Sequence, residues 1–320
     1  MKVLIGPNAF GLERCIDELS PQYPDIDFVF CKAPAELKDA IADADVYMGW
    51  MNRDIFMAAK KLKWVQSPSS GINYYLAIPE FVAGDALLTS ARGTHGACLA
   101  EHTFAMIFAF TRHIREYVEH QKNHTWSARE LRSKMLELTK STMGIIGFGA
   151  VGRSIAKRAA AFDMNVVAVD MFPQNKPDDV ASLEGLDGLD TLLSQSDYVV
   201  VTVPYTEQTD NMIGAAEIAK MKPSAMLVGI SRGGIINEAA LVAALREGRL
   251  AAAALDVFDQ EPLPAESELW DIENLLITPH VAGGSQYECD YILDIFRENI
   301  GRFVRGELPL RNQIDKQRGF

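Results

Sequence analysis

The sequence predicts an α/β protein with two doubly wound, parallel β-sheets, and three observations support this prediction. Short apolar runs alternate with helix-like patterns along the whole chain. Some runs, such as YVVVTV at 198–203 and AMLVGI at 225–230, are continuously apolar, as parallel strands buried on both faces are. The length of 320 residues exceeds what one hydrophobic core usually supports, which favours two domains.

The expected strands fall into two sets, one for each sheet. The first set is 3–5, 28–30, 46–49, 64–66 and 86–88, and the second is 143–146, 165–169, 198–203, 225–230, 252–255 and 275–278. Helix-like patterns predict helices over about 97–119, 151–162 and 287–304. The segment 172–190, which contains prolines and several acids, is predicted to be a loop.

The helix expected from about residue 97 marks the boundary between the two domains. We expect the last helix, 287–304, to return to the first domain, so that this domain is discontinuous. The predicted division is therefore 1–97 together with 287–320, and 98–286.

Composition and charge exclude several classes of partner. Hydrophobic residues make up 48% of the chain and charged residues 23%, as in an ordinary globular protein. The formal net charge is −12, so the surface repels phosphate backbones and anionic lipid. We expect neither a nucleic-acid nor a membrane partner, and an anionic substrate would need a local cationic site.

The cysteines and the N-terminus predict a cytoplasmic protein. Four cysteines lie far apart and form no CxxC pair, which indicates reduced thiols rather than a zinc site: Cys15, Cys31, Cys98 and Cys289. The N-terminal MKVLIG is too short an apolar region for a signal peptide. No stretch reaches the ~18 apolar residues of a membrane span.

The sharpest local motif is a GxGxxG turn formed by Gly147, Phe148, Gly149, Ala150, Val151 and Gly152. It follows an expected strand and opens an expected helix. Gly147 allows a tight turn, Gly149 lets the backbone approach a pyrophosphate, and Gly152 lets helix and strand pack closely. Amides at the helix N-terminus can then hold the pyrophosphate, which predicts a dinucleotide site.

An acid ends the next expected strand, and it favours NAD over NADP. Asp170 follows NVVAV and can accept hydrogen bonds from both ribose hydroxyls. Its charge would repel a 2′-phosphate, and Met171 and Phe172 offer no arginine to receive one. Arg153 and Lys176 keep the NADP alternative open.

Three later segments place chemistry at the carboxyl ends of expected strands. They are ISRGG at 230–234, LDVFDQEPL at 255–263 and TPHVAG at 278–283. Ligands bind at that edge of open α/β sheets, so Arg232, Glu261 and His280 could form a site for a carboxylate-bearing carbonyl compound. Considered alone, each could instead be a solvated or structural residue.

At these motifs the chain closely resembles the D-isomer-specific 2-hydroxyacid dehydrogenases, a family that includes D-lactate, glyoxylate/hydroxypyruvate and D-3-phosphoglycerate dehydrogenases. The resemblance covers nearly the whole chain and is densest over 143–284. It implies two Rossmann-like domains with the active site in the cleft between them. Residues 1–97 with 287–320 would bind substrate, and residues 98–286 would bind NAD. It also implies a homodimer formed through the nucleotide-binding domains.

The resemblance implies a catalytic role for each of the three residues. Arg232 would bind the substrate carboxylate and 2-oxygen with its planar fork of donors. His280 would be the acid in reduction and the base in oxidation, which suits a side chain that titrates near neutrality. Glu261 would pair with His280 and orient its ring. Asp256 resembles the family's acid near the nicotinamide carboxamide.

Further contacts follow from the same resemblance. The expected cofactor-binding residues, besides the glycine turn and Asp170, are Val203, Pro204, Thr209, Ile230, Ser231, Arg232, Asp256, His280 and Gly283. The expected substrate-binding residues are Ser70, Gly71, Arg232 and His280. The segment SSGI at 69–72 resembles a loop whose backbone amides bind the substrate carboxylate. Asn73 stands where the family usually has Asp, so the identity of the small anionic acid stays open.

Three alternatives accompany this prediction. His120 and His124 have the i,i+4 spacing of metal ligands, but no acid or cysteine completes a set, so no metal is expected. An NAD-sensing corepressor on the same fold would retain the dehydrogenase motifs. Formate dehydrogenase has Gln in the place of Glu261, and a glutamine cannot stabilise a charged histidine as a glutamate does.

Overall fold

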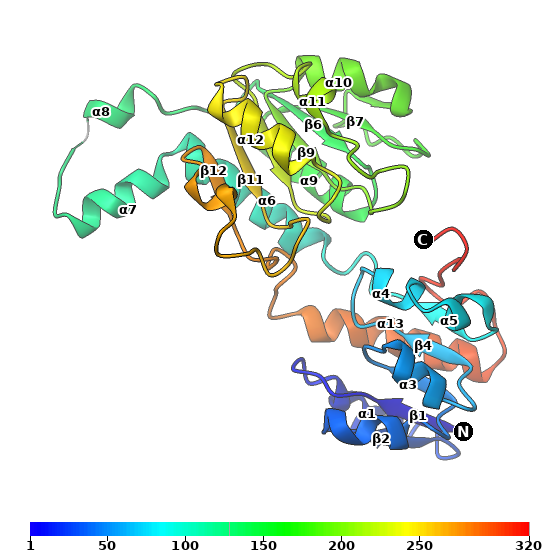
Figure 1. The fold of residues 1–320 in the computed structure, drawn as a ribbon. Helices are drawn as coiled ribbons and strands as arrows, with labels where there is room; N and C mark the ends of the chain where they lie inside the picture. Colours follow the sequence, from blue (N-terminus) through cyan, green and yellow to red (C-terminus); the bar gives the residue numbers. More distant parts are fainter. Residues whose placement is uncertain (128, 320) are drawn as a thin grey trace. The chain divides into compact units, whose positions relative to one another are not determined.

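The computed structural model describes residues 1–127 and 129–319, which form two compact units (Figure 1). Unit 1 comprises Met1–His95 and Ser285–Phe320, and unit 2 comprises Gly96–Gly284. Unit 1 is therefore discontinuous in sequence. The chain changes unit at 95/96 and 284/285, where the sequence-based division lies at 97/98 and 286/287.

Unit 1 is built on a five-stranded parallel sheet with the order β2-β1-β3-β4-β5. Its strands are β1 (Lys2–Ile5), β2 (Asp27–Phe30), β3 (Val46–Met48), β4 (Trp64–Gln66) and β5 (Leu87–Thr89). Its α-helices are α1 (Cys15–Leu19), α2 (Leu37–Ala40), α3 (Arg53–Ala58), α4 (Asn73–Leu76), α5 (Pro79–Ala83) and α13 (Glu288–Val304), with 3-10 helices at Leu12–Arg14 and Pro34–Glu36.

Apolar side chains cover both faces of this sheet. One cluster joins the sheet to helices α2 to α5 and includes Tyr75 and Phe81. The other joins it to α1 and α13, where Phe296 stacks on Trp64 with ring centroids 5.4 Å apart. Helix α13 supplies four buried residues of this cluster and α1 supplies two, so the last helix is part of the core of unit 1.

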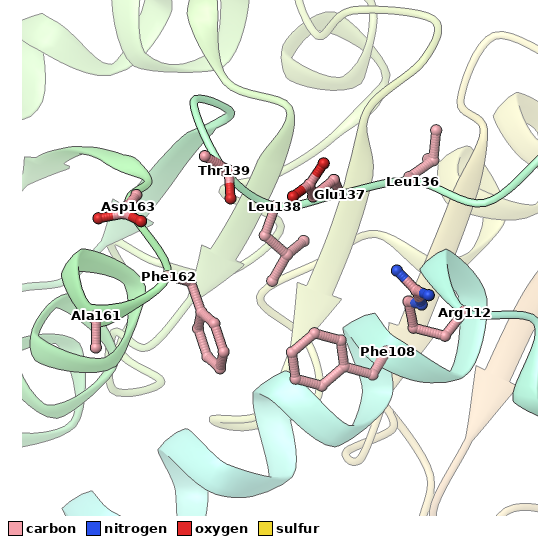
Figure 2. Close-up of a pocket in the computed structure, with 9 residues that line it drawn as sticks. All are labelled: Phe108, Arg112, Leu136, Glu137, Leu138, Thr139, Ala161, Phe162 and Asp163. Atoms are coloured by element: carbon pink, nitrogen blue, oxygen red, sulfur yellow. The ribbon is translucent and has the colours of Figure 1, made fainter.

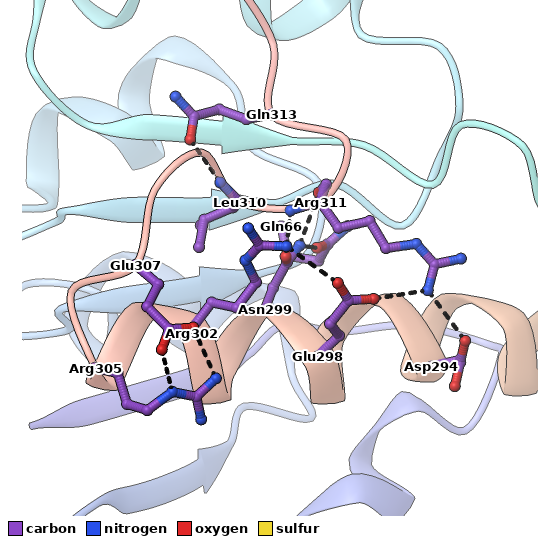
Figure 3. Close-up of polar contacts among 10 residues, drawn as sticks. All are labelled: Gln66, Asp294, Glu298, Asn299, Arg302, Arg305, Glu307, Leu310, Arg311 and Gln313. Carbon is purple, nitrogen blue, oxygen red and sulfur yellow. Dashed lines mark hydrogen bonds and ion pairs between the residues drawn. The ribbon is translucent and has the colours of Figure 1, made fainter.

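Polar contacts attach the C-terminal segment to the sheet (Figure 3). Asn299 of α13 is fully buried; its side-chain nitrogen donates to the Arg311 carbonyl at 2.9 Å, and its oxygen accepts from the Arg311 amide at 2.7 Å. The Gln66 side chain at the end of β4 accepts from Thr89 at 2.8 Å and donates to the Ser67 carbonyl at 2.9 Å. This network fixes the point at which the chain enters the predicted substrate loop.

Unit 2 is built on a seven-stranded parallel sheet with the order β12-β11-β10-β9-β6-β7-β8. Its strands are β6 (Thr142–Ile146), β7 (Asn165–Val169), β8 (Ser182–Glu184), β9 (Tyr198–Val201), β10 (Met226–Gly229), β11 (Ala252–Leu255) and β12 (Leu275–Ile277). Its α-helices are α6 (Gly96–Thr111), α7 (Ile114–Lys122), α8 (Arg129–Arg132), α9 (Ala150–Ala161), α10 (Leu189–Gln195), α11 (Ala215–Ile218) and α12 (Glu238–Arg246), with 3-10 helices at Leu186–Gly188 and Glu268–Asp271.

Helices pack on both faces of this sheet and leave its carboxyl edge to loops. Apolar residues of α10, α11 and α12 form one cluster with the sheet, and those of α6 and α9 form the other. The strand order reverses between β6 and β9, which are neighbours in the sheet. In open α/β sheets ligands bind where the order reverses, so the loops after β6 and β9 are the place to look for a site.

The predicted fold class is confirmed, since both sheets are parallel and covered by helices. All the predicted strands occur. Strands of a helix-covered parallel sheet are buried on both faces, so their sequences are continuously apolar and can be recognised. No helix in the described residues is both long and apolar enough to cross a membrane.

Two expectations about secondary structure were wrong. The segment predicted as a loop over 172–190 contains strand β8 and a 3-10 helix, and α10 begins at Leu189. Strand β8 lies at the edge of the sheet and has the sequence SLE, so it has no apolar run to reveal it. The helix expected over 97–119 is two helices, α6 and α7, because His113 takes a left-handed conformation with φ of +53° and interrupts it.

Candidate active site

The glycine-rich turn joins β6 to α9. Gly147 has φ of +96°, and a Cβ there would press on Thr202 and Val203, so only glycine fits. A Cβ on Gly152 would overlap the Gly147 carbonyl oxygen, whereas a Cβ on Gly149 would meet nothing within 4 Å. The turn is packed on its protein side and open at Gly149, as a pyrophosphate-binding turn requires.

The Asp170 carboxylate lies beside this turn, at the end of β7. It accepts hydrogen bonds from the Phe148 amide at 2.6 Å and from the Phe172 amide at 2.8 Å. It is only partly buried. Its position and its remaining acceptor capacity fit the predicted contact with ribose hydroxyls.

Arg153 and Lys176, the two cations that could receive the 2′-phosphate of NADP, both donate hydrogen bonds to backbone carbonyls. The Arg153 guanidinium donates to Gln174 at 2.6 Å and Asn175 at 2.7 Å, and its carbon lies 4.7 Å from the Phe148 ring centroid. The Lys176 ammonium donates to the Val180 carbonyl at 2.7 Å. Both groups therefore stabilise the loop after β7.

The loop after β9 contains Val203, which is buried, and it is held by the hydroxyls of Thr202 and Thr209. Thr209 donates to the Pro204 carbonyl at 2.7 Å and accepts from the Thr206 amide at 2.8 Å. Thr202 donates to the Gly147 carbonyl at 2.6 Å, which ties this loop to the glycine turn.

Close packing joins the segments that carry Arg232 and Glu261. A Cβ on Gly233 would overlap the Phe258 carbonyl, so glycine is required where the two segments touch. The Gly234 amide donates to the Asp259 carboxylate at 2.7 Å. The Arg232 guanidinium donates to the Ser231 carbonyl at 2.5 Å, and Ile230 before it is buried.

The structure brings His280 and Glu261 into direct contact. Nδ1 of His280 lies 2.7 Å from Oε2 of Glu261, and the Phe258 amide donates to Oε1 at 3.0 Å. An ionised carboxylate only accepts, so Nδ1 carries a proton and Nε2 is the atom left for chemistry. The two side chains are 43% and 34% exposed, which leaves the ring accessible to a ligand.

Asp256 holds the segment that carries His280. Its carboxylate is 1% exposed and accepts from the Thr278 hydroxyl at 2.6 Å, the Val281 amide at 2.9 Å and the Ala282 amide at 2.9 Å. The Asp256 carbonyl accepts from the His280 amide at 2.8 Å. These contacts sustain a φ of +53° at His280, a conformation that costs a non-glycine residue about 1 kcal/mol.

Two contributors to the site were missed at the sequence level. The His102 ring of α6 lies 3.0 Å from the Thr278 hydroxyl and 3.8 Å from the Asp256 carboxylate. Cys98 donates to the carbonyl of Gly283, one of the predicted cofactor residues, at 3.2 Å. No motif marks these residues, because they act through contacts 150 or more positions away in the chain.

The predicted substrate loop belongs to unit 1, where it follows β4. Gly71 donates its amide to the Ser69 hydroxyl at 3.1 Å, and the Ser70 hydroxyl donates to the Ala91 carbonyl at 3.0 Å. Loop and neighbouring segment are therefore joined by side-chain hydrogen bonds.

A cavity of about 280 Å³ lies elsewhere in unit 2 and contains none of the predicted site residues. Figure 2 shows four side chains around it: Phe108 of α6, Arg112 just after this helix, Leu138 and Phe162. Over residues 1–127 and 129–319, no group of three or more His, Cys, Asp or Glu side chains could hold a metal ion.

Comparisons with known proteins agree on one family. Residues 104–282 match the model of the D-isomer specific 2-hydroxyacid dehydrogenase NAD-binding domain. Glycerate dehydrogenase of Methylorubrum extorquens is 40% identical over 214 residues, 65% of either chain. Glyoxylate reductase of Korarchaeum cryptofilum is 32% identical, with 85% of this chain and 82% of the relative covered.

Solved structures agree as well. A D-isomer specific 2-hydroxyacid dehydrogenase family protein from Aeromonas salmonicida has a TM-score of 0.87 at 30% identity, covering 98% of each chain. The NADPH-dependent glyoxylate/hydroxypyruvate reductase of Sinorhizobium meliloti, solved with NADP and sulfate, has a TM-score of 0.84 at 28% identity over the whole of both chains.

The match is less complete against the first curated relatives. It spans 65% of the glycerate dehydrogenase and 52% and 49% of two D-3-phosphoglycerate dehydrogenases. The family itself is clear from the matched domain and from relatives of similar length: this chain belongs to the D-isomer-specific 2-hydroxyacid dehydrogenases.

Proposed function

We propose that this protein reduces a small 2-oxo acid with NADH, or oxidises the corresponding D-2-hydroxy acid with NAD. The observation that carries the proposal is the His280–Glu261 pair, 2.7 Å apart, in a domain that matches a dehydrogenase family. In reduction, Nε2 of His280 gives its proton to the carbonyl oxygen, and in oxidation it takes that proton back. Glu261 stabilises the protonated ring and fixes which nitrogen faces the substrate.

Unit 2 is proposed to bind the dinucleotide. The open position at Gly149 and the first amides of α9 would hold the pyrophosphate, and Asp170 would accept from the ribose. When bound, the nicotinamide ring supplies or accepts the hydride. Asp256 is assigned the task of holding the His280 segment, since its carboxylate already accepts three hydrogen bonds.

NAD is proposed as the preferred cofactor. The Asp170 carboxylate beside the glycine turn disfavours a 2′-phosphate, and Arg153 and Lys176 are engaged with backbone carbonyls. The relative from Sinorhizobium meliloti is described as NADPH-dependent, so the two cofactors need direct comparison.

The substrate is proposed to be a small 2-oxo acid such as glyoxylate or hydroxypyruvate, the compounds in the names of two relatives. Arg232 would bind its carboxylate, because a guanidinium fork matches two carboxylate oxygens. In unit 1, the loop at Ser70 and Gly71 is proposed to bind a carboxylate through its backbone amides.

A homodimer formed through unit 2 is also proposed. No residue of α7 is buried, and Trp126 beyond it is 98% exposed, which is unusual for the largest apolar side chain. The cavity in Figure 2 presents Phe108 and Phe162 to solvent on the same unit. A second copy could cover both surfaces at once, as isologous dimers do.

The cytoplasm is the proposed compartment. All four cysteines are free thiols, and Cys15 and Cys31 are buried. Burial raises the pKa of the Cys15 thiol to about 12, so this group stays protonated and unreactive at neutral pH.

Replacing His280 tests the catalytic proposal. We expect His280→Gln to lower kcat by about 10²- to 10⁴-fold, because proton transfer loses its donor. The Kd for NADH, measured by fluorescence titration, should stay within about twofold. Glu261→Gln should lower kcat less, and Glu266→Gln, an exposed change on the same segment, should have no effect. Near-normal kcat in His280→Gln would refute the role of His280.

The two glycines of the turn separate dinucleotide binding from folding. Gly149→Ala should leave the melting temperature unchanged, because the new methyl group meets no protein atom, but weaken NADH binding at least about tenfold. Gly152→Ala should lower the melting temperature, since its Cβ overlaps the Gly147 carbonyl. Unchanged NADH affinity in Gly149→Ala would place the pyrophosphate elsewhere.

Cofactor choice is tested at Asp170. We expect the wild-type kcat/KM to favour NADH over NADPH. Asp170→Asn keeps an acceptor for the Phe148 amide but removes the charge, so the ratio of the two kcat/KM values should fall by about tenfold. A wild-type preference for NADPH would contradict the cofactor proposal.

The dimer is tested by removing its exposed tryptophan. Sedimentation velocity should show a dimer for the wild type and a weaker one for Trp126→Ser. Trp270→Ser, at a position 51% exposed, is the matched control and should leave the dimer intact. A monomeric wild type at micromolar concentration would refute the proposal.

A further inference from the structure

A second histidine lies beside the proposed substrate loop of unit 1. Nδ1 of His95 lies 2.9 Å from the Ser70 hydroxyl and 2.8 Å from the Thr94 hydroxyl. Nε2 lies 3.4 Å from the Glu288 carboxylate at the start of α13. The His95 and Glu288 side chains are 12% and 20% exposed. His95 therefore links the loop after β4 to the last helix, both within unit 1.

The two hydroxyls also share an acceptor on their other side. Ser70 and Thr94 both contact the Ala91 carbonyl, at 3.0 and 2.7 Å. The His95 ring and the Ala91 carbonyl therefore hold both hydroxyls between them.

The other ring nitrogen faces a carboxylate. An ionised Glu288 only accepts, so Nε2 of His95 is the donor in this contact. Glu288 thereby fixes the orientation of the ring from the side opposite the two hydroxyls.

The contact restrains the loop without using its backbone donors. The hydroxyl of Ser70 is engaged on both sides, and the Ala91 amide donates to the Ser69 carbonyl at 3.1 Å. Within the described residues, the amides of Ser70 and Ile72 donate no hydrogen bond. Two backbone donors thus stay available in a loop that side chains hold still, which is the arrangement that binds a carboxylate.

We propose that His95 is a positioning residue for substrate binding: the hydrogen bond between its Nδ1 and the Ser70 hydroxyl locks Ser70, and with it the amides that receive the substrate carboxylate, while Glu288 orients the ring. This proposal rests on the proposed function, since it assigns the loop to the 2-oxo acid. It predicts a role in substrate affinity and none in dinucleotide binding or proton transfer.

Two nearly isosteric variants separate this role from general stability. The amide nitrogen of Asn is bonded to Cγ, as Nδ1 of histidine is, whereas that of Gln occupies the place of Nε2. His95→Asn should therefore keep the KM for glyoxylate or hydroxypyruvate within about threefold, and His95→Gln should raise it at least about tenfold. The kcat and the KM for NADH should change by less than about threefold in both. The exposed change His124→Gln is the control.

The kinetic outcomes distinguish a failure of the positioning role from a failure of the proposed function. If the wild type reduces a 2-oxo acid but both variants have equal KM values, the positioning role is wrong and the proposed function stands. If the wild type reduces no 2-oxo acid, the proposed function fails, and the assignment of this loop to substrate fails with it.

Discussion

The Asp256 carboxylate, only 1% exposed, accepts three hydrogen bonds from the segment that carries His280. A buried carboxylate is stable only when its oxygens accept hydrogen bonds. Asp256 can therefore be buried only if the backbone of residues 278–282 follows the path that brings these donors to it. That path gives His280 its left-handed backbone and aims Nδ1 at Glu261. The pair itself is half exposed and adds little to stability. The buried contacts of Asp256, and not the ion pair itself, therefore fix the geometry of the pair, which stays accessible to a ligand.

The same division between rigid support and accessible chemistry recurs at the other segments. Glycines fill the places where backbones touch, at Gly147, Gly152 and Gly233, and no side chain could occupy them. Gly149 differs, because its Cβ position is open. In unit 1 the hydroxyls of the loop after β4 are used within the protein, and backbone amides are left over. Such local cationic and amide donors are what an acidic protein of net charge −12 needs to hold an anion.

Most of the fold could be predicted from the sequence, because buried parallel strands are continuously apolar and the glycine turn has fixed spacing. The family could be recognised from short motifs around Arg232, Glu261 and His280, and the matched domain confirms it. Strand β8 could not be found, since an edge strand of three half-exposed residues has no pattern. The contacts of His102 with Thr278 and of His95 with Glu288 join residues more than 170 positions apart, and nothing local encodes them. The catalytic roles themselves stay predictions.

The most direct test of the central claim is NADH consumption with a panel of 2-oxo acids: glyoxylate, hydroxypyruvate, pyruvate, 2-oxobutyrate and bulkier branched or aromatic acids, each repeated with NADPH. The account predicts that at least one small acid is reduced with one NADH consumed per hydroxy acid formed, and that a chiral product has the D configuration. Tight NADH binding without oxidation by any acid in the panel would contradict it, and would point instead to a dinucleotide-sensing protein on the same fold.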